Sequence, residues 1–426
     1  MWTGLDPPSF AGMPTSPSPT VRCWIVAIVA ACVLSLGGTP AVASTLSCGD
    51  TITRDTTLHH DLTNCVGNGL VIGADNIKLN LNGHTLDGND VDDDCPGDTS
   101  CDDGVNNQAG HRGVTVAGGV IREFDLGVLI VDGSDNVLRG LATAQNSVGI
   151  LLDHSTANRI VDGSATDNRF MGVFLVSSSD RNEIRNNTIS GSVLTPGVLL
   201  DGSDHNRVEK NVIDGSDQGL ASSGGSDHND FARNRVSHNL GSAISADEGT
   251  GNRVRENVIT DNGDGITVGF ARQTEIRGNI VRRSGLFGAP DAGGFGILLD
   301  GSDDDTVDGN VVVGGRGPAI FVTSLDNPET SDRNVISRNV ANSTLYDGIL
   351  VNADATDTLL RRNTANGSAH DGIKVEAKGT TLIRNTANHN HDLGIEAVLG
   401  ATDGGGNRAF GNGNPLQCTN VACSGR

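Results

Sequence analysis

Short apolar segments recur along most of the chain, and each begins with a small residue followed by Val, Ile or Leu. The stretch GVLLDGSDHNRVEKNVI at 197–213 returns with few changes as GILLDGSDDDTVDGNVVV at 296–313. Fainter copies follow at steps of mostly 22 to 25 residues, which identifies internal repeats. The residues that open them are Gly127, Gly149, Gly172, Gly197, Gly219, Ala243, Gly265, Gly296, Ala319, Gly348, Gly372 and Gly394.

Each repeat predicts short β-strands. Its apolar runs are rich in Val and Ile and alternate at a period of two. Asp, Gly, Ser and Asn fill the intervals, which is typical of turns, and no helical period is seen. Such a unit buries its apolar face only by stacking on its neighbours. We therefore predict an all-β fold, a single-stranded parallel β-helix (solenoid) of about 12–14 coils with one coil per repeat.

Asparagine recurs at two fixed positions of the repeat. At a bend of a β-helix, an inward Asn lies about 4.8 Å from its copy in the next coil. Its amide can donate to one neighbour and accept from the other, so we predict two asparagine ladders rather than simple turn formation. The ladders comprise Asn136, Asn158, Asn182, Asn206, Asn229, Asn252 and Asn334, and Asn187, Asn211, Asn234, Asn257, Asn279, Asn310, Asn339, Asn363 and Asn385.

The start of the chain predicts a secretory signal peptide. Arg22 precedes an apolar run at 24–36, and Ala-Val-Ala at 41–43 matches a cleavage site. The run is short for a membrane span, although an uncleaved anchor is the alternative. We predict a signal peptide at 1–43 and a β-helix domain with capping segments at both ends at 44–426. We expect a secreted or periplasmic protein with no membrane span after cleavage.

Six cysteines remain after residue 43, as three pairs that are close in sequence and lie near the two ends of the chain. An even number in an exported protein indicates disulfides, although a zinc site is the alternative. Proximity alone supports the predicted bonds, which would close both ends of the rod. They are Cys48–Cys65, Cys95–Cys101 and Cys418–Cys423.

The chain is strongly acidic, with a formal net charge of −22 at pH 7. Such a surface repels nucleic acids and anionic membranes, so we expect neither as a partner. After residue 43 the chain has no Trp and a single Tyr, Tyr346. This composition counts against stacking on neutral sugars but is indifferent for uronates.

Several segments resemble a known family: residues 48–51, GLVIGADNIKLNLNGHTLDG at 69–88, the repeats, and GNGNPLQCTNVAC at 411–423. They are similar to right-handed parallel β-helix repeat proteins of the pectin-lyase-like superfamily, which includes the β-helix of the periplasmic copper-accessory protein NosD and of alginate epimerases. The resemblance covers nearly the whole chain after residue 43 and implies the right-handed form. It implies little about chemistry, since fold does not fix function.

The catalytic motifs of the superfamily are missing. We find no Asp-Pro-His of the alginate epimerases, and Gly110-His111-Arg112 is not the Gly-His-Gly of the polygalacturonases. No catalytic residue is therefore carried over from the family. Copper is not expected either, because soft ligands are scarce: Met171 is the single Met after residue 43.

Outward residues of stacked strands should form vertical stripes. One stripe follows each small–apolar pair by one residue and is mostly apolar, which is unusual on a soluble monomer. We expect cover by loops or self-association, with a foreign partner as the alternative. The stripe comprises Leu151, Phe174, Leu199, Ala221, Ser245, Thr267, Leu298, Phe321, Leu350, Lys374 and Glu396.

A charged stripe includes Arg338, Arg362 and Arg384 at one position of successive repeats. Guanidinium groups match carboxylates, so these arginines are candidates for binding a polyanionic glycan. The favoured alternative is that neighbouring acids neutralise them.

Acidic residues around the Cys95–Cys101 loop suggest a calcium site, because Ca²⁺ prefers oxygen ligands. The loop lacks the EF-hand pattern, and Asp is also an ordinary turn residue. Calcium is the only cofactor that the sequence suggests. The candidate ligands are Asp92, Asp93, Asp94, Asp102 and Asp103.

The catalytic candidates are Asp347, His370, Asp371 and Lys374 in the C-terminal repeats. Asp347 and Asp371 occupy the same position of adjacent repeats, so their repulsion could raise one pKa and create an acid–base pair. The alternative is a set of solvated loop residues.

These observations favour a non-catalytic exported module that binds an extracellular polysaccharide or a surface protein. The first alternative is a polysaccharide lyase or C5-epimerase acting on a uronate polymer, with Lys374 or Arg362 as base and Ca²⁺ acidifying the α-proton. The second is a NosD-like periplasmic accessory protein.

Overall fold

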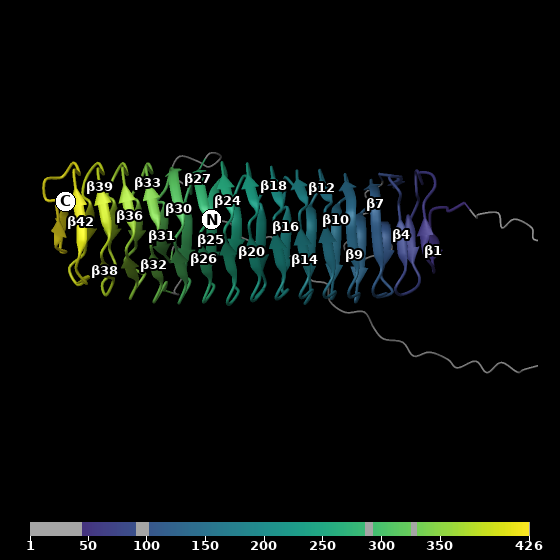
Figure 1. Cartoon of the computed structure of the whole chain (residues 1–426), viewed down its shortest axis with the longest axis horizontal. Coiled ribbons are helices and arrows are strands. Elements are labelled where there is room, and N and C mark those ends of the chain that lie inside the picture. Colours follow the sequence, from purple (N-terminus) through teal and green to yellow (C-terminus); the bar gives the residue numbers. More distant parts are fainter. Residues whose placement is uncertain (1–44, 91–101, 286–292, 325–329, 426) are drawn as a thin grey trace, which may run out of the picture.

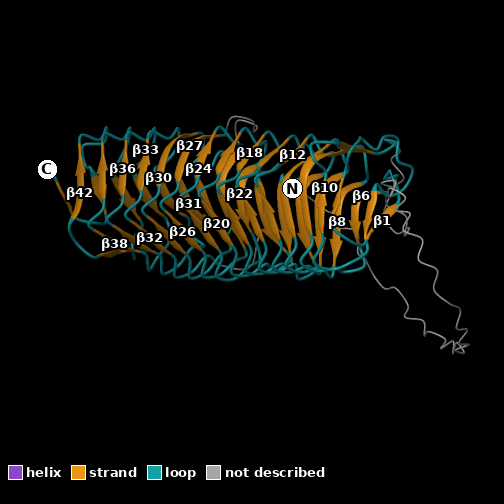
Figure 2. Cartoon of the chain, turned by 45° about the vertical axis from the view of Figure 1, so that its right-hand side comes forward, coloured by secondary structure: helices purple, strands orange, loops and turns teal. Residues whose placement is uncertain are grey.

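In a computed structural model, the chain forms a straight rod of β-strands (Figures 1 and 2). The structure describes residues 45–90, 102–285, 293–324 and 330–425. Within these ranges the chain forms no helix, so none of them provides an apolar helix that crosses a lipid bilayer. The described sequence runs once along the rod, from the purple end to the yellow end in Figure 1.

One strand from each coil joins a single parallel sheet, called sheet A, of 16 strands in the described residues. In stacking order these are β1 (Asp50–Ile52), β3 (Leu70–Ile72), β6 (Asp103–Asn107), β8 (Leu126–Val131), β10 (Val148–Asp153), β13 (Met171–Val176), β16 (Val198–Asp201), β19 (Leu220–Ser223), β22 (Ser242–Ala246), β25 (Asp264–Gly269), β28 (Ile297–Asp300), β31 (Ile320–Thr323), β34 (Ile349–Val351), β37 (Ile373–Val375), β40 (Ile395–Ala397) and β43 (Cys418–Thr419).

The rest of each coil supplies two further parallel ladders, called B1 and B2. Ladder B1 stacks β2 (Thr56–Thr57), β4 (Lys78–Asn80), β7 (Thr115–Arg122), β9 (Val137–Ala144), β11 (Arg159–Val161), β14 (Glu183–Arg185), β17 (Arg207–Glu209), β20 (Asp230–Ala232), β23 (Arg253–Arg255), β26 (Glu275–Arg277), β29 (Thr306–Asp308), β32 (Val335–Ser337), β35 (Leu359–Arg361), β38 (Thr381–Ile383) and β41 (Thr402–Asp403). Ladder B2 stacks β5 (Thr85–Asp87), the second halves of β7 and β9, β12 (Ser164–Thr166), β15 (Thr188–Ser190), β18 (Val212–Asp214), β21 (Arg235–Ser237), β24 (Val258–Thr260), β27 (Ile280–Ser284), β30 (Val311–Gly315), β33 (Val340–Asn342), β36 (Thr364–Asn366), β39 (Thr386–Asn388), β42 (Asn407–Phe410) and β44 (Cys423–Ser424).

Strand pairing confirms the predicted parallel β-helix. Ile150 pairs with Val173, which in turn pairs with Val198, so each repeat is one coil. The 16 strands of sheet A slightly exceed the expected 12–14 coils. The reason is that β1, β3 and β6 before the first repeat, and β43 after the last, stack in the same way.

Inward side chains from all three ladders fill the rod. In one coil, Val198, Leu200, Val208 and Ile213 are fully buried. Close contact between neighbouring coils explains why a small residue opens each repeat. A Cβ added at Gly149 would lie 2.5 Å from the carbonyl oxygen of Gly172, which is the equivalent residue of the following coil.

Both asparagine ladders are present. The main-chain N–H of Asn211 donates to Oδ1 of Asn234 at 3.0 Å, and its Nδ2 donates to the carbonyl of Ile184 at 2.9 Å. The ladder therefore ties the main chain as well as the side-chain amides, which goes beyond the predicted amide stack. In the first ladder, Thr274 and Asp305 replace Asn between Asn252 and Asn334.

Two of the predicted disulfides are confirmed, Cys48–Cys65 at the first described coils and Cys418–Cys423 at the last. The predicted Cys95–Cys101 bond lies outside the described residues. The two observed bonds link neighbouring segments of each cap, where the stack of coils has no further neighbour.

Candidate functional site

The outer face of sheet A carries a continuous column of side chains, called here the sheet A stripe. Phe174 pairs with Leu199, and Leu199 pairs with Ala221, so the register predicted from the sequence is confirmed. The structure extends the apolar column by Leu129, and the register continues from there through Asn106, Val71 and Thr51. Its members are Leu129, Leu151, Phe174, Leu199, Ala221, Ser245, Thr267, Leu298, Phe321, Leu350, Lys374 and Glu396.

The second apolar part of the stripe is covered. Leu298, Phe321 and Leu350 are 7–9% exposed and pack with Phe295, whose ring centroid lies 5.4 Å from that of Phe321. Phe295 enters from the segment before β28, so the predicted loop cover is found here. The first apolar part, from Leu151 to Leu199, is half-buried.

A shallow groove of about 440 Å³ separates the two apolar parts and opens over β22, β25 and β28. Ser223, Ser242, Ser245 and Thr267 line it with hydroxyl groups. Thr267 Oγ1 lies 3.1 Å from Ser242 Oγ and 3.1 Å from Ser245 Oγ. The remaining lining residues include Gln218, Asp247, Glu248, Phe270 and Asp300. The groove therefore presents hydroxyl and carboxyl groups along the rod axis.

Asp247 is the carboxyl of this groove whose pKa is clearly raised. Its Oδ2 accepts a hydrogen bond from Ser245 Oγ at 2.5 Å, and its Oδ1 accepts one from the Gly269 N–H at 2.8 Å. Burial outweighs these bonds and raises the pKa of Asp247 to about 6, with repulsion from Glu248 and Asp300 adding to the effect. The sequence analysis missed Asp247 because an Asp after a strand is an ordinary turn residue.

Charge is unevenly divided between the faces of the rod. In the 16 described strands of sheet A the single basic residue is Lys374, whereas every Arg in a described strand belongs to ladder B1 or B2. Sheet A contributes acidic residues instead. These are Asp50, Asp103, Asp153, Asp201, Asp264, Asp300 and Glu396.

The structure brings three of the predicted catalytic candidates together at the C-terminal coils. Asp347 and Asp371 are 2% and 5% exposed, and Asp347 Oδ1 accepts a hydrogen bond from the Asp371 N–H at 2.8 Å. Lys374 Nζ lies 3.3 Å from Glu376 Oε1 and 3.7 Å from Glu396 Oε2. The fourth candidate, His370, stacks on Tyr346 with ring centroids 4.8 Å apart.

Burial raises the pKa of Asp371 to about 7, and a hydrogen bond with Glu396 and the charge of Asp347 favour the protonated form further. Burial also raises the pKa of Asp347. Asp371 is therefore partly protonated near neutral pH. The sequence analysis placed Glu396 in the stripe but not at this site, because the two carboxyls come from different coils.

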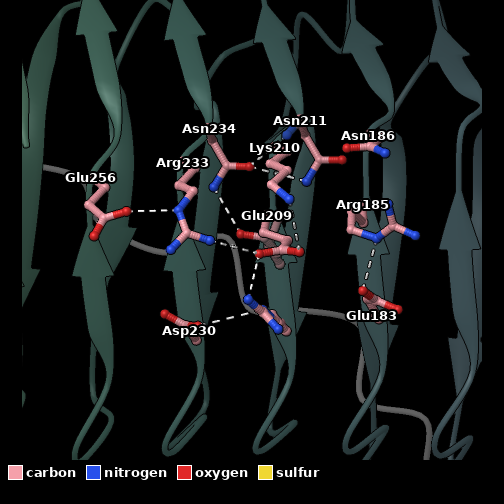
Figure 3. Close-up of polar contacts among 12 residues, drawn as sticks. Glu183, Arg185, Asn186, Glu209, Lys210, Asn211, Asp230, Arg233, Asn234 and Glu256 are labelled. Carbon is pink, nitrogen blue, oxygen red and sulfur yellow. Dashed lines mark hydrogen bonds and ion pairs between the residues drawn. The ribbon is translucent and has the colours of Figure 1, made fainter.

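A network of ion pairs covers ladder B1 in the middle of the rod (Figure 3). The carboxylate of Glu209, 5% exposed, lies 2.6 Å from Arg207, 3.6 Å from Arg233 and 3.9 Å from Lys210. Arg233 Nε also donates to Glu256 at 2.7 Å. We call Glu183, Arg185, Arg207, Glu209, Lys210, Asp230, Arg233 and Glu256 the central network.

The three predicted glycan-binding arginines have different environments. Arg338 Nε donates to Asp308 Oδ1 at 2.7 Å, and this bond holds the pKa of Asp308 below its usual range. Arg338 is thus neutralised, as the alternative prediction stated. Arg362 and Arg384 are exposed, and within the described residues neither forms an ion pair or a side-chain hydrogen bond.

The predicted calcium ligands are only partly described, since Asp92, Asp93 and Asp94 lie outside the described residues. Asp102 Oδ2 accepts a hydrogen bond from the Gly67 N–H at 3.0 Å, and burial raises the pKa of Asp103 to about 8. Calcium binding here stays a prediction.

Comparison with known proteins identifies a family over most of the chain. The family model described as periplasmic copper-binding protein (NosD) matches residues 63–252, 194–339 and 293–413. No curated protein matches the sequence.

Solved structures share the fold at low sequence identity. The A-module of the mannuronan C-5 epimerase AlgE4 from Azotobacter vinelandii is 11% identical, with a TM-score of 0.53 over 84% of this chain and 90% of that one. A tailspike protein of E. coli bacteriophage HK620 is 13% identical, with a TM-score of 0.50 over 89% of this chain and 74% of that one. At these identities the likeness shows the fold alone.

The described residues do not offer a copper donor set. The described cysteines Cys48, Cys65, Cys418 and Cys423 are all in disulfides, and no group of three or more His, Cys, Asp or Glu in the described ranges is arranged to hold a metal ion. The fold and the family match nevertheless agree over residues 63–413. The chain therefore belongs to the NosD family of parallel β-helix proteins.

Proposed function

We propose that the protein is an exported, non-catalytic module that binds an extended extracellular glycan along the outer face of sheet A. The observation that carries this proposal is the groove over β22, β25 and β28, lined by Ser242, Ser245, Thr267 and Asp247. Hydroxyl and carboxyl groups of this kind exchange hydrogen bonds with sugar hydroxyls. A polymer lying along the rod axis would meet equivalent positions every coil, about 4.8 Å apart.

The charge of sheet A narrows the class of glycan. Lys374 is the single basic residue of its described strands, and the groove contains Asp247, Glu248 and Asp300. A polyuronate would be repelled by these carboxylates at neutral pH. The groove therefore fits a neutral glycan or one that carries amino groups. The half-buried apolar residues Leu151, Phe174 and Leu199 would lie against the C–H faces of the sugar rings.

The compartment follows from the cysteines and the start of the chain. Two disulfides are typical of proteins that fold in an oxidising compartment, and residues 1–43 have the pattern of a signal peptide. A secreted or periplasmic location therefore belongs to this proposal.

A lyase or C5-epimerase is the second candidate function. The observation that favours it is the cluster of Asp347, Asp371, Lys374 and Glu396, because Asp371 has a pKa of about 7 and lies next to a second buried carboxyl. A carboxyl that titrates near neutral pH can act as acid or base. An accessory role like that suggested by the family name is the third candidate.

Binding measurements test the first proposal. Isothermal titration calorimetry of the purified protein with dextran, chitosan oligosaccharides and polygalacturonate compares neutral, amino and uronate glycans. Thr267→Arg would place a guanidinium in the groove beside Asp247, whereas Thr188→Arg makes the same change on an exposed Thr of ladder B2.

We expect dextran or chitosan to bind, and Thr267→Arg to weaken that binding by about tenfold while Thr188→Arg leaves it unchanged. Absence of binding to both glycans, or equal binding by the two variants, would reject the groove as their site. Unsaturated-uronate absorbance on polygalacturonate, lost in Asp371→Asn, would instead favour the lyase.

A further inference from the structure

Four exposed arginines lie at the C-terminal end of ladders B1 and B2. Arg361, Arg362, Arg384 and Arg408 are exposed, and in the ranges that the structure describes none of them forms an ion pair or a side-chain hydrogen bond. We call them the C-terminal arginine patch. In a chain with 52 acidic and 30 basic residues, four neighbouring arginines without a carboxylate need a physical explanation.

The register of ladder B1 gives the first part of the explanation. Glu209, Asp230 and Asp308 lie among the arginines of the preceding coils. From β32 onward the outward positions in the described strands of ladder B1 carry no acid. They are Val335, Ser337, Leu359, Arg361, Thr381, Ile383 and Thr402. The next acid in these strands is Asp403 of β41, which lies in register with the inward Leu382.

Asp403 does not serve the arginines either. Its Oδ1 accepts hydrogen bonds from the Gly405 N–H and from Asn407 Nδ2, and its Oδ2 accepts one from the Ala422 N–H. These bonds hold the carboxylate against the C-terminal cap.

Ladder B2 begins directly after the turn that carries Arg362 and Arg384, and its outward positions there are neutral and polar. Thr364 pairs with Thr386, and Asn342 pairs with Asn366, so hydroxyl and amide groups form outward rows beside the arginines. The main-chain N–H of Asn388 donates to Oδ1 of Asn366 at 2.8 Å, which fixes this amide row. The surface is therefore positive and rich in hydrogen-bonding groups.

The arginines are also aligned along the rod. Arg362 and Arg384 occupy the same turn of successive coils with φ of 58° and 54°, so their side chains leave the main chain in the same way. Successive coils lie about 4.8 Å apart. Charges farther than about 8 Å are largely screened at physiological ionic strength, so the local charge of this face matters more than the net charge of −22.

We propose that the C-terminal arginine patch binds an acidic polysaccharide whose carboxylate or sulfate groups pair with Arg361, Arg362, Arg384 and Arg408. Guanidinium groups bind such oxyanions through two parallel hydrogen bonds, and the Asn366 and Asn388 row accepts or donates to the hydroxyls between them. The polymer runs along the rod axis and meets one arginine position per coil. This site lies on ladders B1 and B2 and is separate from the groove proposed on sheet A.

Calorimetry with polygalacturonate and dextran sulfate tests the carboxylate and sulfate forms of this ligand, with sodium sulfate as the free anion. Uncharged dextran is the control glycan, and any binding of dextran at the sheet A groove should be the same in the unchanged protein and in the arginine variant. The test variant is Arg362→Gln/Arg384→Gln. The matched control is Arg233→Gln, which removes an arginine from the same turn of a coil in which it is paired. A single-stranded DNA oligonucleotide of equal charge represents the other class of polyanion.

We expect at least one acidic polysaccharide to bind, with affinity that falls as salt is raised and that is about tenfold weaker in the double variant. Arg233→Gln and the groove variant Thr267→Arg should bind it like the unchanged protein. Failure of both acidic polysaccharides to bind at low salt, equal binding by the double variant, or tighter binding of the DNA would each overturn the proposal. None of these outcomes depends on dextran or chitosan binding to sheet A.

Discussion

The middle and the C-terminal end of ladder B1 have the same backbone but opposite surface chemistry. In the central network, Arg233 lies between Glu209 and Glu256 at 3.6 and 2.7 Å (Figure 3). At the equivalent turn, Arg384 has φ of 54° against 58° for Arg233, yet no carboxylate partner among the described residues. The difference arises only from which residues flank the turn.

This comparison shows that the core and the surface of the rod vary independently. Asn234 and Asn363 make the same ladder contacts below the two surfaces, with Nδ2 bonds of 2.9 and 2.8 Å to the main chain of the previous coil. Outward positions do not touch these contacts, so a coil keeps its fold whether its surface is neutralised or left charged.

The largest expected effect lies at Asp305, in the coil between the two regions. Burial raises its pKa to about 8, and its Oδ2 has no hydrogen-bond partner. An unfolded Asp has a pKa of about 3.9, so the folded state retains a proton that the unfolded state loses, and stability falls as pH rises from about 4 to 8. The free energy of unfolding of the unchanged protein should therefore fall by roughly 4 kcal/mol between pH 5 and pH 8. Asp305→Asn should abolish this fall.

Urea unfolding of both proteins across this pH range measures the effect. Asp304→Asn is the matched control, because the hydrogen bond from Arg333 lowers the pKa of Asp304. Asp304 is therefore ionised in both states across this range, and its replacement should leave the slope of stability against pH unchanged. Parallel stability curves for the unchanged protein and Asp305→Asn would show that Asp305 is ionised in the folded state.

The next effect tests whether the two regions share one core. Asn234→Ala and Asn363→Ala should each reduce the free energy of unfolding by about 3 kcal/mol, because each leaves a buried main-chain N–H and a buried carbonyl without a partner. For Asn234 these groups are the Asn211 N–H and the Val208 carbonyl. For Asn363 they are the Asn339 N–H and the Ile336 carbonyl. Thermal unfolding of both variants checks this, and a loss at one position alone would mean that the ladders are not equivalent.

A smaller effect separates the two surfaces. Glu209→Gln should cost about 1–2 kcal/mol, since it leaves three cations facing each other, although their own exposure of 41–50% moderates the cost. Arg362→Gln should change stability by less than about 0.5 kcal/mol. Equal costs in urea unfolding would indicate that Arg362 has a structural partner.

The smallest effect is expected when an acid of the central network is introduced at the equivalent position of the C-terminal coils. Asp230 pairs with Arg255 one coil farther along, and Val335 is at the equivalent position relative to Arg361. Val335→Asp should therefore neutralise Arg361 and weaken binding of an acidic polysaccharide by about threefold to tenfold. Val335→Asn is the uncharged control, and calorimetry that finds both variants unchanged would exclude Arg361 from the site.

The sites were less predictable than the fold. The sequence placed Asp347, Asp371 and Lys374 near each other because they hold fixed positions in successive repeats. Glu396 at this site and Asp247 in the groove were missed. Their role depends on burial and on contacts between coils, which no single repeat encodes.

By itself the sequence determined the β-helix, its register, the sheet A stripe and both asparagine ladders. The reason is that alternation at a period of two and a constant repeat length are local properties that stacking preserves. The two observed disulfides were predictable because their cysteines lie close together in the sequence. The tertiary structure alone decided that Asp308 neutralises Arg338, while Arg362 and Arg384 have no ion-pair partner in the part of the chain that the structure describes. The reason is that charge pairing depends on side chains brought within a few ångströms by adjacent coils, although they lie 22 to 31 residues apart in the chain.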